Sequence, residues 1–246
     1  QKENKILSLL THVYIHNNYI FSHSINVAIY SAVIAAKLGY DDKKLEEIAI
    51  GGLFHDIGKI MIPSEILNKS GKLTPEEYEI VKKHTEFGFE ILRKQSSISL
   101  LSAHCAYQHH ERLDGTGYPR NLKAKEIHPY AKIVAVADVF DTLTSNRAYR
   151  KAMLPHEALE VLFAGTFDHE VVQAFQKSIA IYPEGVTVKL NTGETGVVVK
   201  SNFHVPARPV VRVIKDFKGN DLVKPYDLDL TNCLSVMITE CDAIIG

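Results

Sequence analysis

Apolar residues recur at intervals of three and four positions through most of the first 180 residues, as they do in amphipathic helices. In the segment 22–38 this spacing continues until Gly39, a residue type that commonly ends helices. The segment Thr74–Glu77 is a strong start signal, because a threonine cap and a first-turn proline are followed by a glutamate that completes a capping box. The pattern predicts helices over 22–38, 42–57, 75–94, 97–110, 128–146, 155–164 and 168–180.

After Pro183 the pattern changes to short runs of β-branched residues separated by Gly, Asn and Pro. Runs of this kind, bounded by turn formers, are typical of strands. They lie at 186–188, 196–199 and 209–213. The sequence therefore predicts a mainly α fold in two parts, an all-helical domain over 1–180 and a small β-rich domain over 181–246.

Composition limits the classes of function. With 246 residues, of which 46% are apolar and 23% charged, the chain has the make-up of a globular protein with a sizeable core. A formal net charge of −1 gives no overall field that favours DNA, RNA or an anionic membrane, so we expect none of these as partners. No apolar stretch reaches ~18 residues without polar interruption, which predicts that no segment spans a membrane.

The cysteines and the first residue add two expectations. Three scattered cysteines are too few for a disulfide framework or a cysteine-based zinc site, and they suit a reducing, cytoplasmic location. Because the chain begins with Gln1 and not with methionine, we expect it to be part of a longer protein, with an upstream sensor domain as one candidate. The role of the C-terminal domain is open, and dimerisation of the chain into a homodimer is one alternative for it.

Histidine and aspartate residues of the helical domain form a set of candidate metal ligands. The adjacent pair His55-Asp56 follows an apolar run, and a carboxylate with two oxygens can bridge two metals. Asp138 lies inside an apolar helical segment, where a buried carboxylate needs a partner or a metal. The full set is His23, His55, Asp56, His84, His109, His110 and Asp138. Five imidazoles and two carboxylates are too many for one metal and fit two, the usual device for attack on a phosphodiester.

Each candidate also has a structural interpretation. A single histidine at a helix start, such as His23, is more often a capping or surface residue than a ligand. The neighbours His109 and His110 would lie ~100° apart on a regular helix, so both reach one metal only if the helix ends there. Asp141, one turn after Asp138, is a candidate hydrogen-bond partner for a ligand.

Longer motifs surround these residues and make a resemblance specific. They read HDIGK (55–59), GKLTPEEYE (71–79), KKHTEFGFEIL (82–92), HHERLDGTGYP (109–119) and AVADVFDTLTSNRAYR (135–150). In this order and spacing, over about residues 17–178, they resemble the HD-GYP family, a subset of the HD-domain metal-dependent phosphohydrolases. The segment 111–127, with three turn formers within five residues, would form the loop that carries the second half of the family name.

The resemblance implies an HD-type phosphohydrolase domain and a bacterial cyclic di-GMP phosphodiesterase. Its product would be pGpG, with further cleavage to GMP left open. Two divalent metals are implied, iron or manganese first and zinc, nickel or magnesium as alternatives. His23, His55, Asp56 and Asp138 would hold one metal, and Asp56, His84, His109 and His110 the other. Asp56 would thereby be catalytic, because a hydroxide bridging the two metals would attack phosphorus.

The resemblance also implies substrate contacts. Lys59 would be catalytic and substrate-binding, either touching a phosphate or protonating the leaving group. Arg147 and Arg150 match family positions that contact phosphates or bases, although both also fit a solvated helix end. Tyr118 would border the cleft and bind substrate there. In the family this loop is also discussed as a contact for a diguanylate cyclase.

The sequence departs from the family pattern in places, and it leaves alternatives open. Tyr19 stands where some members carry a glutamate for a third metal, so we expect two metals. The segment 165–169 is one residue shorter than the matching stretch of the family and lacks its proline, so we expect it to reshape the lip of the site. The related dinucleotide 3′,3′-cGAMP is an alternative substrate. A low-turnover cyclic di-GMP sensor or cyclase-docking module is an alternative of another class.

Overall fold

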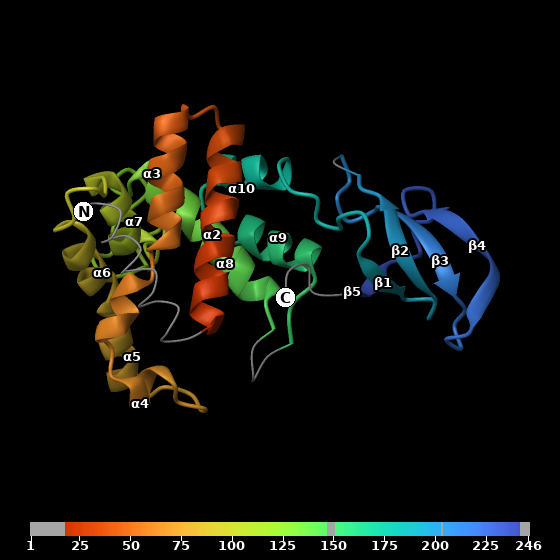
Figure 1. The fold of residues 1–246 in the computed structure, drawn as a ribbon, viewed down its shortest axis with the longest axis horizontal. Helices are drawn as coiled ribbons and strands as arrows, with labels where there is room; N and C mark the ends of the chain where they lie inside the picture. The colour runs from red at the N-terminus through yellow and green to blue at the C-terminus, as the bar shows by residue number, and fades with distance from the viewer. Residues whose placement is uncertain (1–17, 147–150, 203, 242–246) are drawn as a thin grey trace. The chain divides into compact units, whose positions relative to one another are not determined.

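The computed structural model describes residues 18–146, 151–202 and 204–241, which divide into two compact units. The first unit contains the described residues up to Thr142 together with 165–175, and the second contains 143–164 and the residues from Gln176 onward. The prediction of a helical domain followed by a small β domain is confirmed (Figure 1). The boundary at residue 180 stays a prediction.

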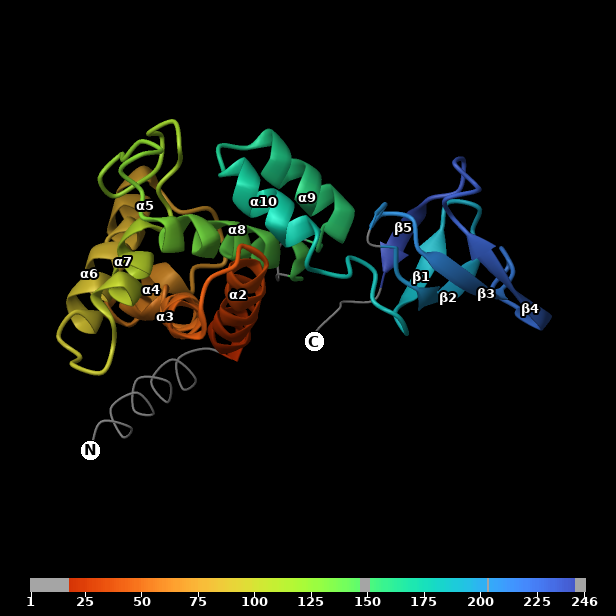
Figure 2. The ribbon, with the colours of Figure 1, turned by 90° about the horizontal axis from the view of Figure 1, so that it is seen from above.

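The helical part of the chain carries the elements that position the candidate ligands. These are α2 (Asn18–Lys37), α3 (Asp42–Leu53), the short 3-10 helix η1 (Ile57–Met61), α4 (Ser64–Leu67), α5 (Pro75–Lys82), α6 (His84–Leu92), α7 (Leu100–Gln108), α8 (Pro129–Thr144), α9 (Pro155–Ala164) and α10 (His169–Gln176). Helix α8 runs through the middle of the first unit, between α2, α7 and α10 (Figure 2). Its residues from Ile133 to Asp138 are all buried, which explains their nearly unbroken apolar sequence.

Two predicted helices end earlier than expected. The predicted helix 42–57 ends at Leu53, and η1 follows after three residues. The predicted helix 75–94 is two helices, α5 and α6, with Lys83 between them. Its start is confirmed, since the Thr74 hydroxyl accepts a bond from the Glu77 amide at 3.2 Å and the Glu77 carboxylate accepts one from the Thr74 amide at 2.7 Å.

The core of the first unit joins elements that are distant in sequence. Phe54, Ile57 and Leu92 pack with Ala103 and Ala106 of α7 in one buried cluster. Burial of such side chains is the main stabilising contribution to a fold of this kind. The rings of Tyr30, Phe140 and Phe175 form a second contact group, with centroid distances of 4.7 to 5.5 Å. These contacts hold α2 and α8 side by side.

One helix in the described part of the chain is long and apolar enough to cross a membrane, by length and composition alone. It is the stretch Ile20–Lys37 of α2, of which 39% is buried inside the protein. The sequence prediction rested on the polar residues that interrupt this stretch. Its mean hydropathy is nevertheless high enough for a membrane-spanning helix. His23 and Asn26 of this stretch make buried or half-buried polar contacts with Asp141, as expected for a core helix.

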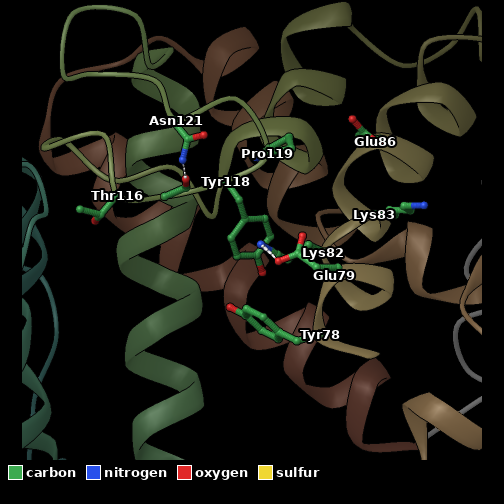
Figure 3. Close-up of a pocket in the computed structure, with 10 residues that line it drawn as sticks. Tyr78, Glu79, Lys82, Lys83, Glu86, Thr116, Tyr118, Pro119 and Asn121 are labelled. Carbon is green, nitrogen blue, oxygen red and sulfur yellow. Dashed lines mark hydrogen bonds and ion pairs between the residues drawn. The ribbon is translucent and has the colours of Figure 1, made fainter. Parts of the chain in front are cut away.

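The loop 111–127 connects α7 to α8 and lies against α5 and α6 (Figure 3). Its first residue, Glu111, is buried, and its carboxylate accepts bonds from the amides of Arg120 and Leu122 at 2.8 and 2.9 Å. Gly117 packs closely, because a Cβ there would lie 2.4 Å from the Arg112 nitrogen and from the His110 carbonyl oxygen. The sequence identified the loop but not the carboxylate that shapes it.

The second unit carries a five-stranded antiparallel sheet in the order β4-β3-β2-β1-β5. Its strands are β1 (Thr187–Leu190), β2 (Thr195–Lys200), β3 (Val210–Lys215), β4 (Asp221–Asp229) and β5 (Ile238–Cys241). Val188, Val198, Val211 and Val213 point to one buried face, which is the alternation expected of half-buried strands. The sequence missed β4 and β5. Strand β4 is an exposed edge strand with Pro225 inside it, and β5 is a short strand at the opposite edge of the sheet.

Candidate metal centre

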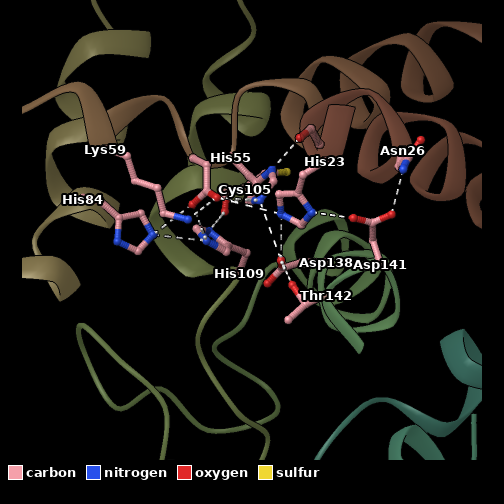
Figure 4. Close-up of polar contacts among 12 residues, drawn as sticks. His23, Asn26, His55, Lys59, His84, Cys105, His109, Asp138, Asp141 and Thr142 are labelled. Carbon is pink, nitrogen blue, oxygen red and sulfur yellow. Dashed lines mark hydrogen bonds and ion pairs between the residues drawn. The ribbon is translucent and has the colours of Figure 1, made fainter. Parts of the chain in front are cut away.

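All seven predicted ligands come together in the first unit, and Figure 4 shows His23, His55, His84, His109 and Asp138 among them. They arrive from α2, from the junction of α3 and η1, from the first residue of α6, from the end of α7 and from α8. Six of the seven are buried, and His110 is partly buried. Helix α7 ends at Gln108, so His109 and His110 leave the regular helix and belong to the same group.

Close backbone packing at Gly58 brings His84 next to Asp56. A Cβ at Gly58 would lie 1.9 Å from the His84 carbonyl oxygen and 2.5 Å from the Gly88 nitrogen. Only a residue without a side chain allows η1 and the start of α6 to approach this closely. The break between α5 and α6 at Lys83 therefore accompanies a tight backbone contact beside the site.

The ligand atoms form two groups, in each of which all atoms lie within 4.8 Å of one another. One group contains Asp56, His84, His109 and His110, and the other contains His23, His55 and Asp138. These are two buried His/Asp clusters consistent with a binuclear metal site. The prediction of two metals is supported to this extent, while the role of each residue as a ligand stays a prediction.

The two oxygens of Asp56 face different histidines. Oδ1 lies 3.3 Å from His84 Nε2 and 3.8 Å from His109 Nε2. Oδ2 lies 3.4 Å from His55 Nε2 and 3.9 Å from His23 Nε2. Ligands of one metal with ~2.1 Å bonds lie about 3.0–3.5 Å apart, so these separations approach those of a coordination sphere. Asp56 thus has the geometry of a bridging carboxylate.

Asp138 completes the second group. Its Oδ1 lies 3.2 Å from His23 Nε2 and 3.8 Å from His55 Nε2. The hydroxyl of Thr142, one turn further along α8, contacts the same oxygen at 3.4 Å. A buried carboxylate between two imidazoles in this arrangement satisfies the expectation that a charge inside an apolar helix has partners.

Backbone carbonyls fix the tautomer of three histidines. The Nδ1 atoms donate to carbonyl oxygens, His55 to Gly52 at 2.6 Å, His84 to Val81 at 2.7 Å and His109 to Cys105 at 3.0 Å. A carbonyl oxygen can only accept, so Nδ1 carries the proton and Nε2 presents a lone pair to the cluster. Among the described residues, the buried atoms His55 Nε2 and Asp56 Oδ1 have no hydrogen-bond partner.

These observations together test whether the residues fit a pair of cations. Lone pairs of His84 Nε2 and Asp56 Oδ1 face each other at 3.3 Å, an arrangement that is unfavourable for two acceptors and favourable around a cation. The donor set of nitrogens and carboxylate oxygens suits iron, manganese, zinc or nickel. The residues therefore fit the expected metals, and the chemistry of the donors leaves the identity of the metal open.

Asp141 and Asn26 hold His23. Nδ1 of His23 lies 2.7 Å from Asp141 Oδ2, and the Asn26 amide donates to Asp141 Oδ1 at 2.9 Å. A carboxylate on the far nitrogen of a ligating histidine orients the ring and raises its basicity. Asp141 lies where the sequence placed a hydrogen-bond partner. Asn26 was missed, although its position three residues after His23 puts it on the same helix face.

Burial and charge set the protonation states of the cluster. Burial lowers the pKa of His84 to about 4 and that of His109 to about 3, so both are neutral near pH 7 as ligands must be. At His23 burial is outweighed by hydrogen bonds to Asp138 and Asp141, which raise its pKa to about 9 in the metal-free chain, so that a metal bound at Nε2 would displace a proton. Burial would raise the pKa of Asp56, but Lys59 and His55 hold it well below its usual range.

Lys59 connects the buried cluster to its surroundings. Its ammonium group forms an ion pair with Asp56 Oδ2, and its side chain is 25% exposed whereas that of Asp56 is 3% exposed. The cation therefore lies at the open side of the cluster, where the sequence expected a phosphate contact. The ring of Tyr118 stacks on His110 with a centroid distance of 4.6 Å. Arg147 and Arg150 lie outside the described residues.

Comparison with known proteins identifies the two parts of the chain. The family model of the HD domain matches residues 9–170. A model described as the KOW domain associated with HD domain matches residues 187–244. A solved structure of Bd1817, described as an HDG"Y"P protein from Bdellovibrio bacteriovorus, is similar with a TM-score of 0.52 at 26% identity, over 63% of this chain and 50% of that one.

The curated relatives match between 63% and 92% of this chain. The chain is 38% identical to cyclic di-GMP phosphodiesterase PA4108 of Pseudomonas aeruginosa, over 92% of this chain and 55% of that protein. It is 47% identical to a cyclic di-GMP phosphodiesterase of Thermotoga maritima, over 63% and 43% of the two chains. It is 37% identical to 3'3'-cGAMP-specific phosphodiesterase 3 of Vibrio cholerae, over 69% of this chain and 37% of that protein. The chain spans about half the length of the first two relatives.

Proposed function

The chain belongs to the HD domain family and is related to HD-GYP cyclic di-GMP phosphodiesterases, and from this premise we propose that it hydrolyses a 3′,5′ phosphodiester bond of cyclic di-GMP to give pGpG. The observation that carries the proposal is the position of Asp56. Its two oxygens face two separate groups of imidazole nitrogens, as expected of a carboxylate shared by two metals.

The cluster supplies the charges that phosphodiester cleavage needs. The two groups of His and Asp residues would hold two divalent cations, with iron or manganese as the first candidates. These cations would supply positive charge to the phosphate and would lower the pKa of bound water. The chain's own residues do the rest: the backbone carbonyls and Asp141 orient the imidazoles, and buried packing excludes bulk water. Lys59 places an ammonium group beside Asp56, where it can neutralise a phosphate oxygen or donate a proton to the departing ribose 3′ oxygen.

The substrate assignment draws on the relatives. Those named as cyclic di-GMP phosphodiesterases reach 38% and 47% identity. A relative named as specific for 3′3′-cGAMP reaches 37% identity over 69% of the chain, so this dinucleotide is the second candidate substrate. Both candidates present the same 3′,5′ phosphodiester to the cluster, and the base-contacting residues decide between them. A low-turnover binding module is disfavoured, because binding alone does not require two buried ligand groups.

One experiment separates these candidates. The full chain is loaded with Mn²⁺ or Fe²⁺ under reducing conditions, its metal content is measured, and its products from cyclic di-GMP and from 3′,3′-cGAMP are separated by chromatography. We expect two metals per chain and faster conversion of cyclic di-GMP to pGpG. Faster conversion of cGAMP would favour the second candidate. Binding of either dinucleotide without turnover would overturn the proposed activity.

Asp56→Asn and Asp42→Asn are a matched pair for this experiment. Both replace one carboxylate by an amide on the same segment of the chain, but Asp56 is buried among the ligands and Asp42 is exposed in the first turn of α3. We expect Asp56→Asn to lose metal and turnover together and Asp42→Asn to keep both. Full turnover by Asp56→Asn would contradict the assigned role of this carboxylate.

A further inference from the structure

A groove lies beside the candidate metal centre. It has a volume of about 470 Å³ and is lined by α5, the start of α6 and the loop 111–127. Figure 3 shows that Tyr78, Lys82 and Tyr118 point toward one another at its centre. None of the predicted metal ligands lines it, and neither Tyr78 nor Lys82 was a candidate site residue in the sequence.

Two aromatic rings and one ammonium group define the groove. The rings of Tyr78 and Tyr118 are nearly perpendicular, with centroids 6.3 Å apart. Lys82 Nζ lies 5.3 Å from the Tyr78 centroid and 5.7 Å from that of Tyr118. Tyr78 is 47% exposed, so part of its ring is accessible from the groove that it lines. The three groups form a π surface with a cation beside it.

Tyr118 connects this groove to the metal centre. Its ring stacks on the His110 ring at 4.6 Å and lies 6.4 Å from the His84 ring. The groove therefore begins one aromatic ring away from the group formed by Asp56, His84, His109 and His110. A molecule whose phosphate reached that group could place an attached ring system in the groove.

We propose that this groove binds a guanine base of the cyclic dinucleotide, with Tyr78 as the stacking surface and Lys82 as a donor to the base. The assignment rests on the proposed function. Every base has a π face that stacks on aromatic side chains. Guanine adds two acceptors, O6 and N7, on the edge that a lysine commonly contacts.

Carboxylates of the groove favour guanine over adenine. Glu79 and Glu86 line it, and Glu79 pairs with Lys82 at 2.5 Å between Oε1 and Nζ. Carboxylates only accept hydrogen bonds, and the N1–H and N2–H groups of guanine offer donors on one edge. Adenine presents an acceptor at N1, which a carboxylate repels. Tyr78, Lys82 and Glu79 are thus the residues that would determine base specificity.

The test compares substrates with and without a base in the metal-loaded full chain. Tyr78→Ala is the main variant, Tyr78→Phe keeps the ring, and Lys94→Met is the matched control for Lys82→Met, since the Lys94 side chain is 70% exposed and outside the groove. We expect Tyr78→Ala to raise KM for cyclic di-GMP about tenfold or more. The effect on bis(p-nitrophenyl) phosphate, which has no base, should be much smaller, and Tyr78→Phe should restore KM.

Binding measurements keep the outcome independent of turnover. By calorimetry, the wild-type chain should bind GMP more tightly than ribose 5-phosphate, and Tyr78→Ala should remove most of that difference. Glu79→Gln should reduce the preference for cyclic di-GMP over cyclic di-AMP. Unchanged GMP binding and unchanged KM in Tyr78→Ala and Lys82→Met would overturn the assignment and leave the groove to a protein partner.

The two proposals fail in different ways. If the wild-type chain does not hydrolyse a cyclic dinucleotide, the proposed function fails, and the comparison of GMP with ribose 5-phosphate still tests the groove. If the wild-type chain hydrolyses cyclic di-GMP and the Tyr78 and Lys82 variants behave like Lys94→Met, only the base assignment fails.

Discussion

Gly58→Ala tests whether close backbone packing positions the metal centre. The added Cβ would lie 1.9 Å from the His84 carbonyl oxygen and 2.8 Å from its carbonyl carbon. Real Cβ contacts essentially never fall below 3.0 Å, so the start of α6 must move away from η1 by about 1 Å. The atoms in the way are backbone, so no rotamer change relieves the contact. His84 moves with them, because the carbonyl belongs to the same residue as the imidazole.

The magnitude follows from this displacement. Overpacking of a tight contact costs about 2–3 kcal/mol, which lowers Tm by about 4–12 °C for a domain of this size. A shift of ~1 Å at a catalytic group costs about 10²-fold in rate. We therefore expect Gly58→Ala to fold with reduced stability, to bind less metal at the group that contains His84, and to lose most turnover.

The assay compares Gly58→Ala with Gly71→Ala. Gly71 is exposed, has no atom within 4 Å of an added Cβ and shows no positive φ, so its substitution should leave Tm and metal content unchanged. Metal content is measured by mass spectrometry after dialysis, and Tm by circular dichroism of the metal-free and metal-loaded chains. Wild-type Tm and metal content in Gly58→Ala would refute the argument from close packing.

Three further predictions concern the residues around the cluster. Asp141→Asn should weaken metal binding about 10- to 100-fold, because His23 loses the carboxylate that orients it, and competition with a chelator measures the change. Lys59→Met should lower kcat for cyclic di-GMP by about 10²-fold or more while metal content stays near two, and stopped assays measure kcat. The metal-free chain should be most stable near pH 6.5. The fold keeps His84 and His109 neutral, so the free energy of unfolding decreases as pH falls from 6.5 toward 4. The fold keeps His23 protonated, so the free energy of unfolding also decreases as pH rises from 6.5 toward 9.

Controls separate these effects from loss of fold. Asp42→Asn should leave chelator competition unchanged. If Lys59 protonates the leaving group, Lys59→Met should lose far less with bis(p-nitrophenyl) phosphate, whose leaving group needs no proton, whereas equal losses would assign it to the phosphate. For pH dependence, unfolding by urea measures the free energy, and a stability that rose steadily from pH 6.5 to 9 would contradict the state assigned to His23.

Local signals in the sequence were enough for most helices and for the candidate ligands. The capping box at Thr74 and the proline and glutamate after it define a helix start whose partners lie within three residues. The buried aspartate of α8 stood out because a carboxylate in an apolar helix needs a partner. Both are short-range arguments, so neighbouring residues carry the information.

Other features depended on contacts between distant segments. The break at Lys83 accompanies the packing of Gly58 against His84, and a helix pattern over 75–94 contains no sign of it. Strands β4 and β5 pair with the outer edges of β3 and β1, and Pro225 and the four charged residues of β4 obscure its strand pattern in the sequence. Asn26 and Glu111 gained their roles from partners that lie 115 and at least nine residues away.

The candidate metal centre likewise depends partly on local residue types and partly on contacts between distant segments. The residue types at His55, Asp56 and Asp138 already indicated metal binding, because imidazole and carboxylate donors together suit divalent transition metals. Folding assigned Oδ1 of Asp56 to one pair of histidines and Oδ2 to another, and it placed the Tyr78–Lys82 groove beside them. These positions depend on how the helices α2, α5, α6, α7 and α8 and the loop 111–127 pack together. Such packing of distant elements follows from the whole chain and not from any single motif.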